Sequence, residues 1–409
     1  MPLIRLSKSA REHAPQQQVL LLDEGWVVTP HIAAGLRNAG CSVHILTATS
    51  NRGLADAKYL GPWITREMAP PIRSEEYISA VETAMADWPQ AQVLALTEPV
   101  MYRLWDTDRV WIDRVFPRCS SWQRELLRDK ACLSRHVANA GLSIPRQISL
   151  RSAAHVDAAM QALGLPVVVK GAVSRGGNAV RIVDSPQDVY RAFAEFSQSG
   201  SVFLQQYIPG PTLLAGGLFC DGQPLRIYAA EKVESTCNTG PSLRLRSEAD
   251  PALIACMLQV FQAMRWSGLA SLDMMRDPDG GYCFIEFNPR PWGSIAACAK
   301  AGVHLFGPLA ALLRGTVPEP DLNFAAGVEA TLFPQVASTR LCEGNLRSLL
   351  GFVREPRMWL DAPWRDPGLT AHLARDIWWN WRKKAGPSNA LQISEMPADT
   401  PVPGAKPSL

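Results

Sequence analysis

The feature that most constrains the fold is a pair of strand-like runs in the second half of the chain. GLASLDMMRD (268–277) and YCFIEFN (282–288) are linked by the turn sequence DPDGG, which predicts a hairpin. Successive side chains of a strand point to opposite faces, so Glu286 and Asn288 are expected to point the same way. The hairpin brings Asp273 of the first strand within reach of them. The sequence therefore predicts two carboxylates and an amide side by side.

This group of side chains has the chemistry of a magnesium–polyphosphate site. Carboxylate and amide oxygens suit a hard cation such as Mg²⁺ or Mn²⁺. Arg290 follows directly, where a fixed cation can hold phosphate oxygens. The competing interpretation of a Glu-x-Asn strand is a solvated sheet face. Ile285 and Phe287, expected to point into a core, and the matched Asp273 favour the site.

A second motif is VVVKGAVSRGGNAV (167–180), which predicts a buried strand, a glycine-rich turn and a second strand. Lys170 stands at the end of the first strand. Backbone N–H groups of the loop around Gly176 and Gly177 can form a concave anion site. On its own the motif fits an ordinary hairpin equally well. LQQYIPGPT (204–212) indicates only a strand followed by a turn.

The first part of the chain indicates a parallel sheet. VLLLD (19–23), a helix-like stretch at 32–38 and SVHILTA (42–48) follow one another as strand, helix and strand. QVLALTEP (92–99) is a further expected strand, with Thr97 and Glu98 at its carboxyl end. The pattern G-x-G-x-x-G is absent after the first strand, so the dinucleotide-binding fingerprint is not present.

After residue 118 the sequence predicts several helices and a different domain organisation. The run LLRDKACLSRHVANAG (126–141) has a helical period, and helices are expected at 186–196 and 251–265. The predicted organisation is a flexible tail (1–18), an α/β domain (19–118), an α+β domain of two subdomains (119–316, with one subdomain at about 150–210), a helical region (317–385) and a disordered tail (386–409).

Bulk properties exclude several classes of protein. The net charge of +3 over 409 residues gives no reason to expect a nucleic-acid partner. Nine cysteines without CxxC spacing argue against a disulfide framework or a zinc site and fit a reducing cytoplasm. The apolar stretch 295–313 is interrupted by polar residues, glycine and proline, so it is expected to be a buried helix and turn and not a membrane span. The N-terminus lacks the apolar run of a signal peptide.

In combination, these motifs resemble the ATP-grasp superfamily. The resemblance is strongest to the carbamoyl-phosphate synthetase large-subunit-like group, with D-alanine–D-alanine ligase and biotin carboxylase more distant. It rests on pieces that occur in the family's order between about 121 and 305: DK (129–130), GLSIP (141–145), VVVKGAVSRGGNAV, QQYIPG, GLASLDMMRDPDGG and YCFIEFNPRPWGS. The spacing from Asp273 to Glu286 and the string E-x-N-P-R are the most specific. The resemblance implies a pre-ATP-grasp, Rossmann-like domain before an ATP-grasp domain.

The resemblance also implies roles for single residues. Those implied to hold ATP are Lys130, Lys170, Gly176, Gly177, Gln206, Ile208 and Thr212. Asp273, Glu286 and Asn288 are the implied magnesium ligands. Arg290 and Lys232 are the implied catalytic cations, and Glu98 is expected to face the acceptor pocket. Gln206 stands where the family often has an acidic residue, and Thr212 where a ribose-binding Glu is common.

The C-terminal region carries the run WLDAPWRDPGLTAHLARDIWWNWRKK (359–384), in which Trp378, Trp379 and Trp381 precede three basic residues. The favoured interpretation is a helix packed on the core, with a basic end that complements its dipole. The alternative is contact with a membrane surface.

The function implied by the resemblance is an ATP- and Mg²⁺-dependent ligase. It would activate a small carboxylate as an acyl phosphate and join it to an amine or similar nucleophile in the cytoplasm, and a homodimer is compatible with it. Two alternatives stay open: a carbamoyl-phosphate or carboxylase type of reaction on bicarbonate, and a non-catalytic ATP-binding regulatory protein.

Overall fold

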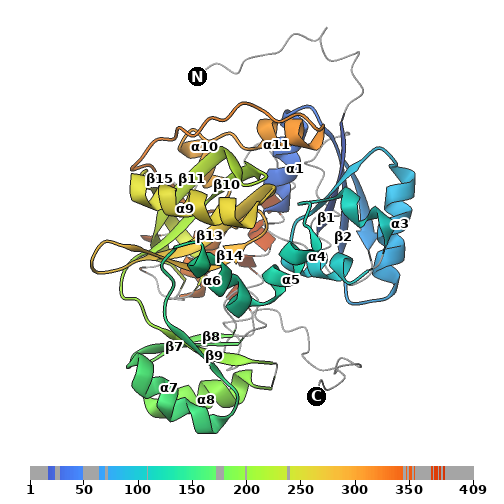
Figure 1. Ribbon diagram of the computed structural model, residues 1–409. Coiled ribbons are helices and arrows are strands. Elements are labelled where there is room, and N and C mark those ends of the chain that lie inside the picture. The colour runs from blue at the N-terminus through green and yellow to red at the C-terminus, as the bar shows by residue number, and fades with distance from the viewer. Residues whose placement is uncertain are drawn as a thin grey trace.

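The computed structural model contains three sheets and the helices that cover them (Figure 1). It describes residues 17–23, 28–48, 64–69, 72–107, 109–171, 179–198, 200–236 and 240–343, together with isolated positions between 347 and 382. Gly176, Gly177 and Trp379 lie outside the described residues, as do both predicted tails except for residues 17 and 18.

The N-terminal domain is a parallel five-stranded sheet of strand order β3-β2-β1-β4-β5. The expected parallel pairing of 19–23 with 42–48 is confirmed by the register of β1 and β2. The elements of this domain are β1 (Gln18–Asp23), α1 (Thr29–Asn38), β2 (Ser42–Ala48), β3 (Ile64–Ala69), α3 (Glu76–Asp87), β4 (Gln92–Ala95), α4 (Glu98–Trp105), η3 (Val110–Arg114) and β5 (Val115–Phe116).

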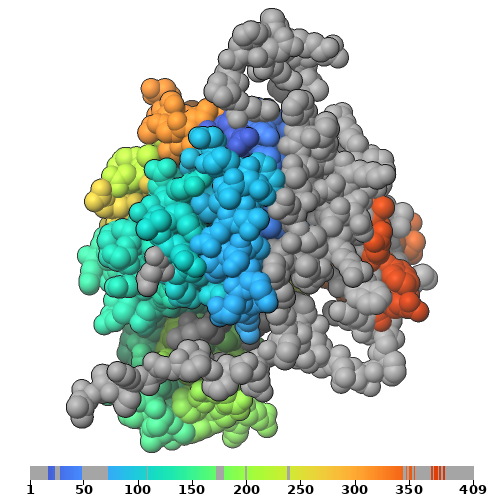
Figure 2. Space-filling model, turned by 90° about the vertical axis from the view of Figure 1, so that its right-hand side faces the viewer, coloured from blue at the N-terminus to red at the C-terminus, as the bar shows by residue number. Residues whose placement is uncertain are grey.

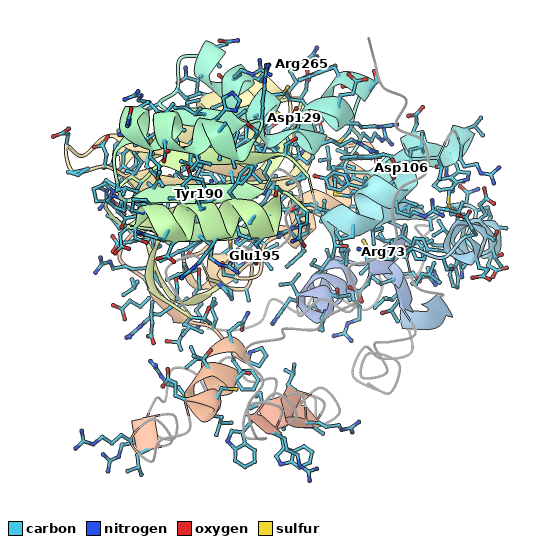
Figure 3. All side chains as sticks on the ribbon, turned by 90° about the horizontal axis from the view of Figure 1, so that it is seen from below. Arg73, Asp106, Asp129, Tyr190, Glu195 and Arg265 are labelled. Carbon is cyan, nitrogen blue, oxygen red and sulfur yellow. The ribbon has the colours of Figure 1, made fainter. Side chains whose placement is uncertain are left out.

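A four-stranded antiparallel sheet with two helices forms a separate lobe, the lid, below the rest of the molecule (Figures 1 and 2). The strand order is β6-β9-β7-β8, and the lid has its own core of Val, Leu and Phe side chains. From below, helix α8 with Tyr190 and Glu195 lies in front (Figure 3). The lid elements are β6 (Gln147–Leu150), η4 (Ala153–His155), α7 (Val156–Leu163), β7 (Val167–Gly171), β8 (Val180–Val183), α8 (Pro186–Phe196) and β9 (Val202–Gln206).

The largest sheet is a six-stranded antiparallel sheet of order β14-β13-β10-β11-β12-β15. Its strands and the helices after the lid are β10 (Thr212–Cys220), β11 (Gln223–Ser235), β12 (Ser242–Ser247), α9 (Pro251–Met264), β13 (Gly268–Arg276), β14 (Tyr282–Asn288), α10 (Ala297–Lys300), α11 (Phe306–Leu313), β15 (Glu329–Thr331) and α12 (Gln335–Cys342). One face of this sheet packs against α9. The other face forms a second core with side chains of α1, α10 and α11.

Two glycines allow close packing, one between helices α1 and α11 and one within the central sheet. At Gly35 in α1, a Cβ atom would lie 2.1 Å from Cδ2 of Phe306 in α11. In the middle of β10, a Cβ atom on Gly217 would lie 1.9 Å from the carbonyl oxygen of Arg226. Any side chain at either position would force the packed elements apart, because protein interiors leave no room for it.

The helix predicted at 126–141 is wrong as a single element. Helix α5 (Ser121–Arg128) ends before Asp129, and α6 (Lys130–Asn139) begins after it. Asp129 is the N-cap of α6, and its Oδ1 accepts from the backbone N–H groups of Ala131 at 2.8 Å and Cys132 at 3.0 Å. The first backbone N–H groups of a helix have no partner within the helix, and Asp129 accepts hydrogen bonds from two of them. This cap stabilises the start of α6 and therefore the boundary between the two helices.

The region from 317 is not helical throughout. The short strand β15 completes the edge of the central sheet by pairing with β12, and α12 follows it. Further on, the buried Ile377 packs with Leu243 and Val336, whereas Trp378 and Trp381 are exposed. No helix among the described residues is long and apolar enough to span a membrane.

Alternation along β14 is interrupted by one extra residue. Asp273 pairs with Glu286, but Met274 pairs with Phe284, so Ile285 is left over as a bulge. Ile285 is only half-buried, and its predicted place in the core is wrong. The core holds Phe284 and Phe287, which are three residues apart. Only an inserted residue allows both to face the core while Glu286 stays opposite Asp273.

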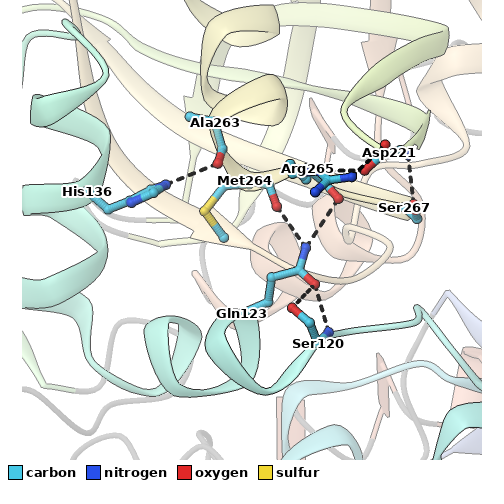
Figure 4. Close-up of polar contacts among 8 residues, drawn as sticks. All are labelled: Ser120, Gln123, His136, Asp221, Ala263, Met264, Arg265 and Ser267. Atoms are coloured by element: carbon cyan, nitrogen blue, oxygen red, sulfur yellow. Dashed lines mark hydrogen bonds and ion pairs between the residues drawn. The ribbon is translucent and has the colours of Figure 1, made fainter.

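A buried amide connects α5 to the end of α9 (Figure 4). The Gln123 Nε2 group donates to the carbonyl oxygens of Met264 at 2.7 Å and Arg265 at 3.2 Å, and its Oε1 accepts from the Ser120 backbone N–H at 2.8 Å. We expect Gln123→Ala to lower the free energy of unfolding by about 1–3 kcal/mol, because it strands buried carbonyls. Chemical denaturation measures this. The exposed Gln262→Ala in α9 is the control, and an equal loss in both variants contradicts the argument.

Candidate active site

The three predicted magnesium ligands come together on β13 and β14. Asp273 and Glu286 are directly opposite each other in the antiparallel pair. The side chain of Asn288, the last residue of β14, lies beside Asp273, with 3.5 Å between Nδ2 and Oδ2. All three residues are half-buried, so their side chains remain partly accessible to solvent. The predicted cluster of two carboxylates and an amide is thus present as a geometric unit.

Each carboxylate of this cluster is paired with a lysine from another element. Lys130 Nζ, at the start of α6, lies 2.8 Å from Glu286 Oε1. Lys232 Nζ, on β11, lies 2.7 Å from Asp273 Oδ1. Burial pushes the pKa of Asp273 upward, but Lys232, Arg290 and the hydrogen bond from Asn288 together hold that pKa below its usual value. Both lysines named from the sequence therefore lie at the centre.

Lys170 reaches the same centre from the lid. It is the fourth residue of β7, and burial lowers the pKa of its ammonium group to about 8, an effect opposed by the charges of Glu286 and Asp273. The negative charges of Glu286 and Asp273, which belong to the central sheet, therefore stabilise the charged form of a lysine in the lid. Lys170 is thus a cation that the lid contributes to the carboxylate cluster.

Arg290 connects the hairpin to the N-terminal domain. Its Nη2 donates to Asn288 Oδ1 at 3.1 Å, its Nε donates to Glu98 Oε1 at 3.0 Å, and its Nη1 donates to the carbonyl oxygen of Pro291 at 3.1 Å. Glu98 is the first residue of α4, after the carboxyl end of β4. Burial raises the pKa of the Glu98 carboxyl against the lowering effect of Arg290. The planar guanidinium is therefore held in one orientation.

The remaining predicted nucleotide residues lie where the lid joins the central sheet. The backbone N–H of Gln206 donates to the Arg146 carbonyl at 2.8 Å, and Ile208 lies between β9 and β10. Thr212, the first residue of β10, places its hydroxyl 3.3 Å from the sulfur of Met275. Their predicted contacts with adenine and ribose stay predictions.

The donor set fits magnesium bound together with phosphate. Within the described residues, no group of three His, Cys, Asp or Glu side chains could hold a metal without other ligands. Two carboxylates and an amide oxygen are hard donors, and Mg²⁺ usually takes one or two carboxylates and completes its shell with phosphate oxygens and water. The surrounding lysines and Arg290 match the negative charge of that phosphate.

One charged group beside the centre was not found from the sequence. Glu234 of β11 lies 2.9 Å from Arg244 of β12 and also pairs with Arg340 of α12. Residues 234 and 340 are 106 positions apart, and no local spacing signals such a contact. This group attaches α12 to β11, the strand that carries Lys232.

Comparison with known proteins identifies the part of the chain that holds these groups. Residues 129–305 match the family described as the carbamoyl-phosphate synthase L chain, ATP-binding domain. This segment contains Lys130, Lys170, Lys232 and the whole β13–β14 hairpin. The match confirms the resemblance to the ATP-grasp group that the sequence predicts. The predicted ATP-binding domain of this type is confirmed at the level of the family.

Similar proteins agree with this assignment. The large chain of carbamoyl phosphate synthase from Methanoculleus marisnigri is 24% identical over 218 residues, which are 49% of this chain and 20% of that relative. Biotin carboxylase from Campylobacter jejuni, solved as a β-γ-ATP complex, aligns with a TM-score of 0.63 and 16% identity over 78% of this chain and 75% of that chain. L-amino acid ligase from Bacillus licheniformis aligns with a TM-score of 0.56 and 17% identity over 74% and 75% of the two chains. These structural likenesses show a shared fold.

Proposed function

We propose that the protein is a ligase that activates a carboxylate with ATP and joins it to an amine. The observation that carries this proposal is the cluster of Asp273, Glu286 and Asn288, surrounded by Lys130 and Lys232, with Lys170 contributed by the lid. Such a set suits a reaction between a carboxylate and a triphosphate, because both reactants are anionic and need cations around them. The fold likeness to an L-amino acid ligase supports an amine as the acceptor.

The position of each site residue suggests its role in this reaction. Lys130 and Lys170 would hold phosphate oxygens, and Asp273, Glu286 and Asn288 would hold magnesium, which neutralises charge on the transferred phosphoryl group. Arg290, fixed by Glu98, would orient the carboxylate that attacks the γ-phosphate. A C–O–P linkage forms, and ADP leaves. The amine then displaces inorganic phosphate from the acyl carbon, and its proton passes to solvent. The lid would exclude water from the acyl phosphate.

The experiment for this proposal is acyl-phosphate trapping. Purified protein is incubated with Mg-ATP, hydroxylamine and a panel of carboxylic acids, and hydroxamate and ADP are measured. We expect both products with at least one acid and neither without an acid. ADP release that depends on bicarbonate alone would favour the carboxylase type of reaction, a candidate supported by the fold likeness to biotin carboxylase. Nucleotide binding without ADP release across acids and bicarbonate would favour the regulatory alternative.

The lysine pairs predict that metal binding depends on nucleotide. A free divalent ion would have to displace Lys130 and Lys232 from the carboxylates, whereas Mg-ATP brings phosphates that receive those lysines. We expect Lys232→Met to strengthen Mn²⁺ binding without nucleotide by about tenfold, since the Asp273 carboxylate is then released. The signal of unbound Mn²⁺ in electron paramagnetic resonance measures this binding.

The control for that prediction removes a cation from an exposed ion pair elsewhere. Arg265 pairs with Asp221 at 2.9 Å on the surface, so Arg265→Met is expected to leave Mn²⁺ binding unchanged. Equal binding by the Lys232 variant and the unaltered protein contradicts the role assigned to the lysine pairs.

A further inference from the structure

The junction between α5 and α6 determines where Lys130 lies. The segment that matches the family begins at this junction, at residue 129. Lys130 is the first residue of α6, and its Nζ lies 2.8 Å from Glu286 Oε1. Helices α4, α5 and α6 follow one another above the lid, so α4 of the N-terminal domain lies close to the junction (Figure 1). The N-terminal domain can therefore influence the position of this ammonium group.

A tyrosine of the N-terminal domain supplies a hydrogen bond to the junction. The Tyr102 hydroxyl in α4 donates to the carbonyl oxygen of Leu127, in the last turn of α5, at 3.1 Å. The last four carbonyl groups of a helix have no partner within the helix, so this oxygen needs a donor from outside it. Burial raises the pKa of Tyr102, and the charges of Glu98 and Glu286 raise it further. The hydroxyl therefore stays protonated at neutral pH and remains a donor.

Arg128, the last residue of α5, makes further contacts with α4. Its Nη1 lies 2.7 Å from Oδ1 of Asp106 at the end of α4, and its Nη2 donates to the Tyr102 carbonyl oxygen at 3.5 Å. The side chains of Arg128 and Asp106 are 40% and 51% exposed, so water and salt weaken the attraction between their charges. The hydrogen bond from the Tyr102 hydroxyl is thus the stronger attachment of the junction to α4.

Helix α4 presents one face to the proposed reaction centre. Glu98 and Tyr102 are four residues apart, which places them on the same face of the helix. Glu98 holds Arg290 at 3.0 Å, and the charge of Glu286 acts on both Glu98 and Tyr102. The hydroxyl that holds the junction therefore lies near the carboxylate with which Lys130 pairs.

We propose that Tyr102 is a positioning residue for nucleotide binding: it fixes the start of α6 through the Leu127 carbonyl and so keeps the Lys130 ammonium group in place for the phosphates of ATP. Asp129 caps α6, so the junction is held on both sides of the break. When the binding-competent arrangement is only partly populated, the apparent affinity falls by that fraction. This inference rests on the role proposed for Lys130, and it assigns to the nucleotide site a residue that precedes the segment 129–305.

The test is a double-mutant cycle on nucleotide affinity. Tyr102→Phe keeps the ring and removes only the hydroxyl. Binding of a non-hydrolysable ATP analogue with magnesium is measured calorimetrically for the unaltered protein, for Tyr102→Phe, for Lys130→Met and for the double variant. We expect Tyr102→Phe to weaken binding by about fivefold and Lys130→Met by about tenfold. In the Lys130→Met background, Tyr102→Phe is expected to have no further effect, because the group that it positions is absent.

A second tyrosine provides a matched control. Tyr190 on α8 of the lid is exposed, and its hydroxyl forms a hydrogen bond with Asp157 (Figure 3). Tyr190→Phe is expected to bind the analogue as the unaltered protein does, and a thermal scan checks that each variant is folded at the temperature of the titration.

The outcomes separate this inference from the proposed function. Unchanged affinity in Tyr102→Phe, or the same loss with and without the Lys130 side chain, overturns the role of Tyr102 and leaves that of Lys130 intact. Unchanged affinity in Lys130→Met contradicts the phosphate contact proposed for Lys130, and the role of Tyr102 is then wrong as well.

Discussion

Glu286→Gln is expected to lower acid-dependent ADP release by about 10²- to 10³-fold while the protein remains folded. The amide removes the charge that we propose to hold magnesium opposite Asp273, and it also releases Lys130, so two contributions to charge neutralisation are lost together. The Glu286 side chain is 38% exposed and does not belong to a core cluster, so the melting temperature should change by no more than about 2 °C. Steady-state ADP release and a thermal scan measure the two effects.

A matched control for this variant exists in the lid. Glu195 on α8 pairs with Arg181 at 3.2 Å, and its side chain is 58% exposed (Figure 3). Glu195→Gln removes a carboxylate from a comparable ion pair away from the hairpin, and we expect its turnover to equal that of the unaltered protein. Full activity in Glu286→Gln, or the same loss in both variants, is inconsistent with magnesium binding at Glu286.

Arg290→Lys is the second change with a large expected effect. The guanidinium contacts Glu98, Asn288 and the Pro291 carbonyl at the same time, and a lysine ammonium is a single point that cannot reach all three. We expect kcat to fall by about 10²-fold, since the carboxylate substrate loses its orientation, while the affinity for the ATP analogue changes little. Turnover kinetics and calorimetric titration of the analogue check both parts.

Turnover kinetics of Glu98→Gln test whether Glu98 acts only by positioning Arg290. Glu98 acts through Arg290, so its loss should lower kcat by less than Arg290→Lys does. A wild-type kcat in Arg290→Lys contradicts the role given to the guanidinium. A larger loss in Glu98→Gln than in Arg290→Lys contradicts the assignment of Glu98 as a residue that only positions it.

The cluster of two carboxylates and an amide was predictable because it is local. Asp273, Glu286 and Asn288 lie within one hairpin, and strand alternation with a turn sequence determines their relation. The bulge at Ile285 also had a signal that alternation overlooked: Phe284 and Phe287 are three residues apart, and both are large enough to require burial. The boundary at Asp129 had a signal too, since Asp is a preferred N-cap residue.

Other parts of the site carry no signal in a single sequence. Lys130 and Glu286 are 156 positions apart, and Glu98 and Arg290 are 192 apart, so only tertiary packing determines these pairs. Strand β15 has three residues, too few for a period to show, and it depends on β12 beside it. The resemblance supplied roles for the lysines, but the structure shows that Lys130 pairs with Glu286 and Lys232 with Asp273.

The most direct test of the proposed chemistry follows an oxygen atom. An acid that supports ADP release is prepared with ¹⁸O in both carboxylate positions, and the inorganic phosphate formed with Mg-ATP and the amine is analysed by mass spectrometry. If the carboxylate attacks the γ-phosphate and the amine later displaces phosphate, one ¹⁸O atom passes into each phosphate released. Phosphate without the label would mean that water attacks ATP, and the acyl-phosphate account of this site would be wrong.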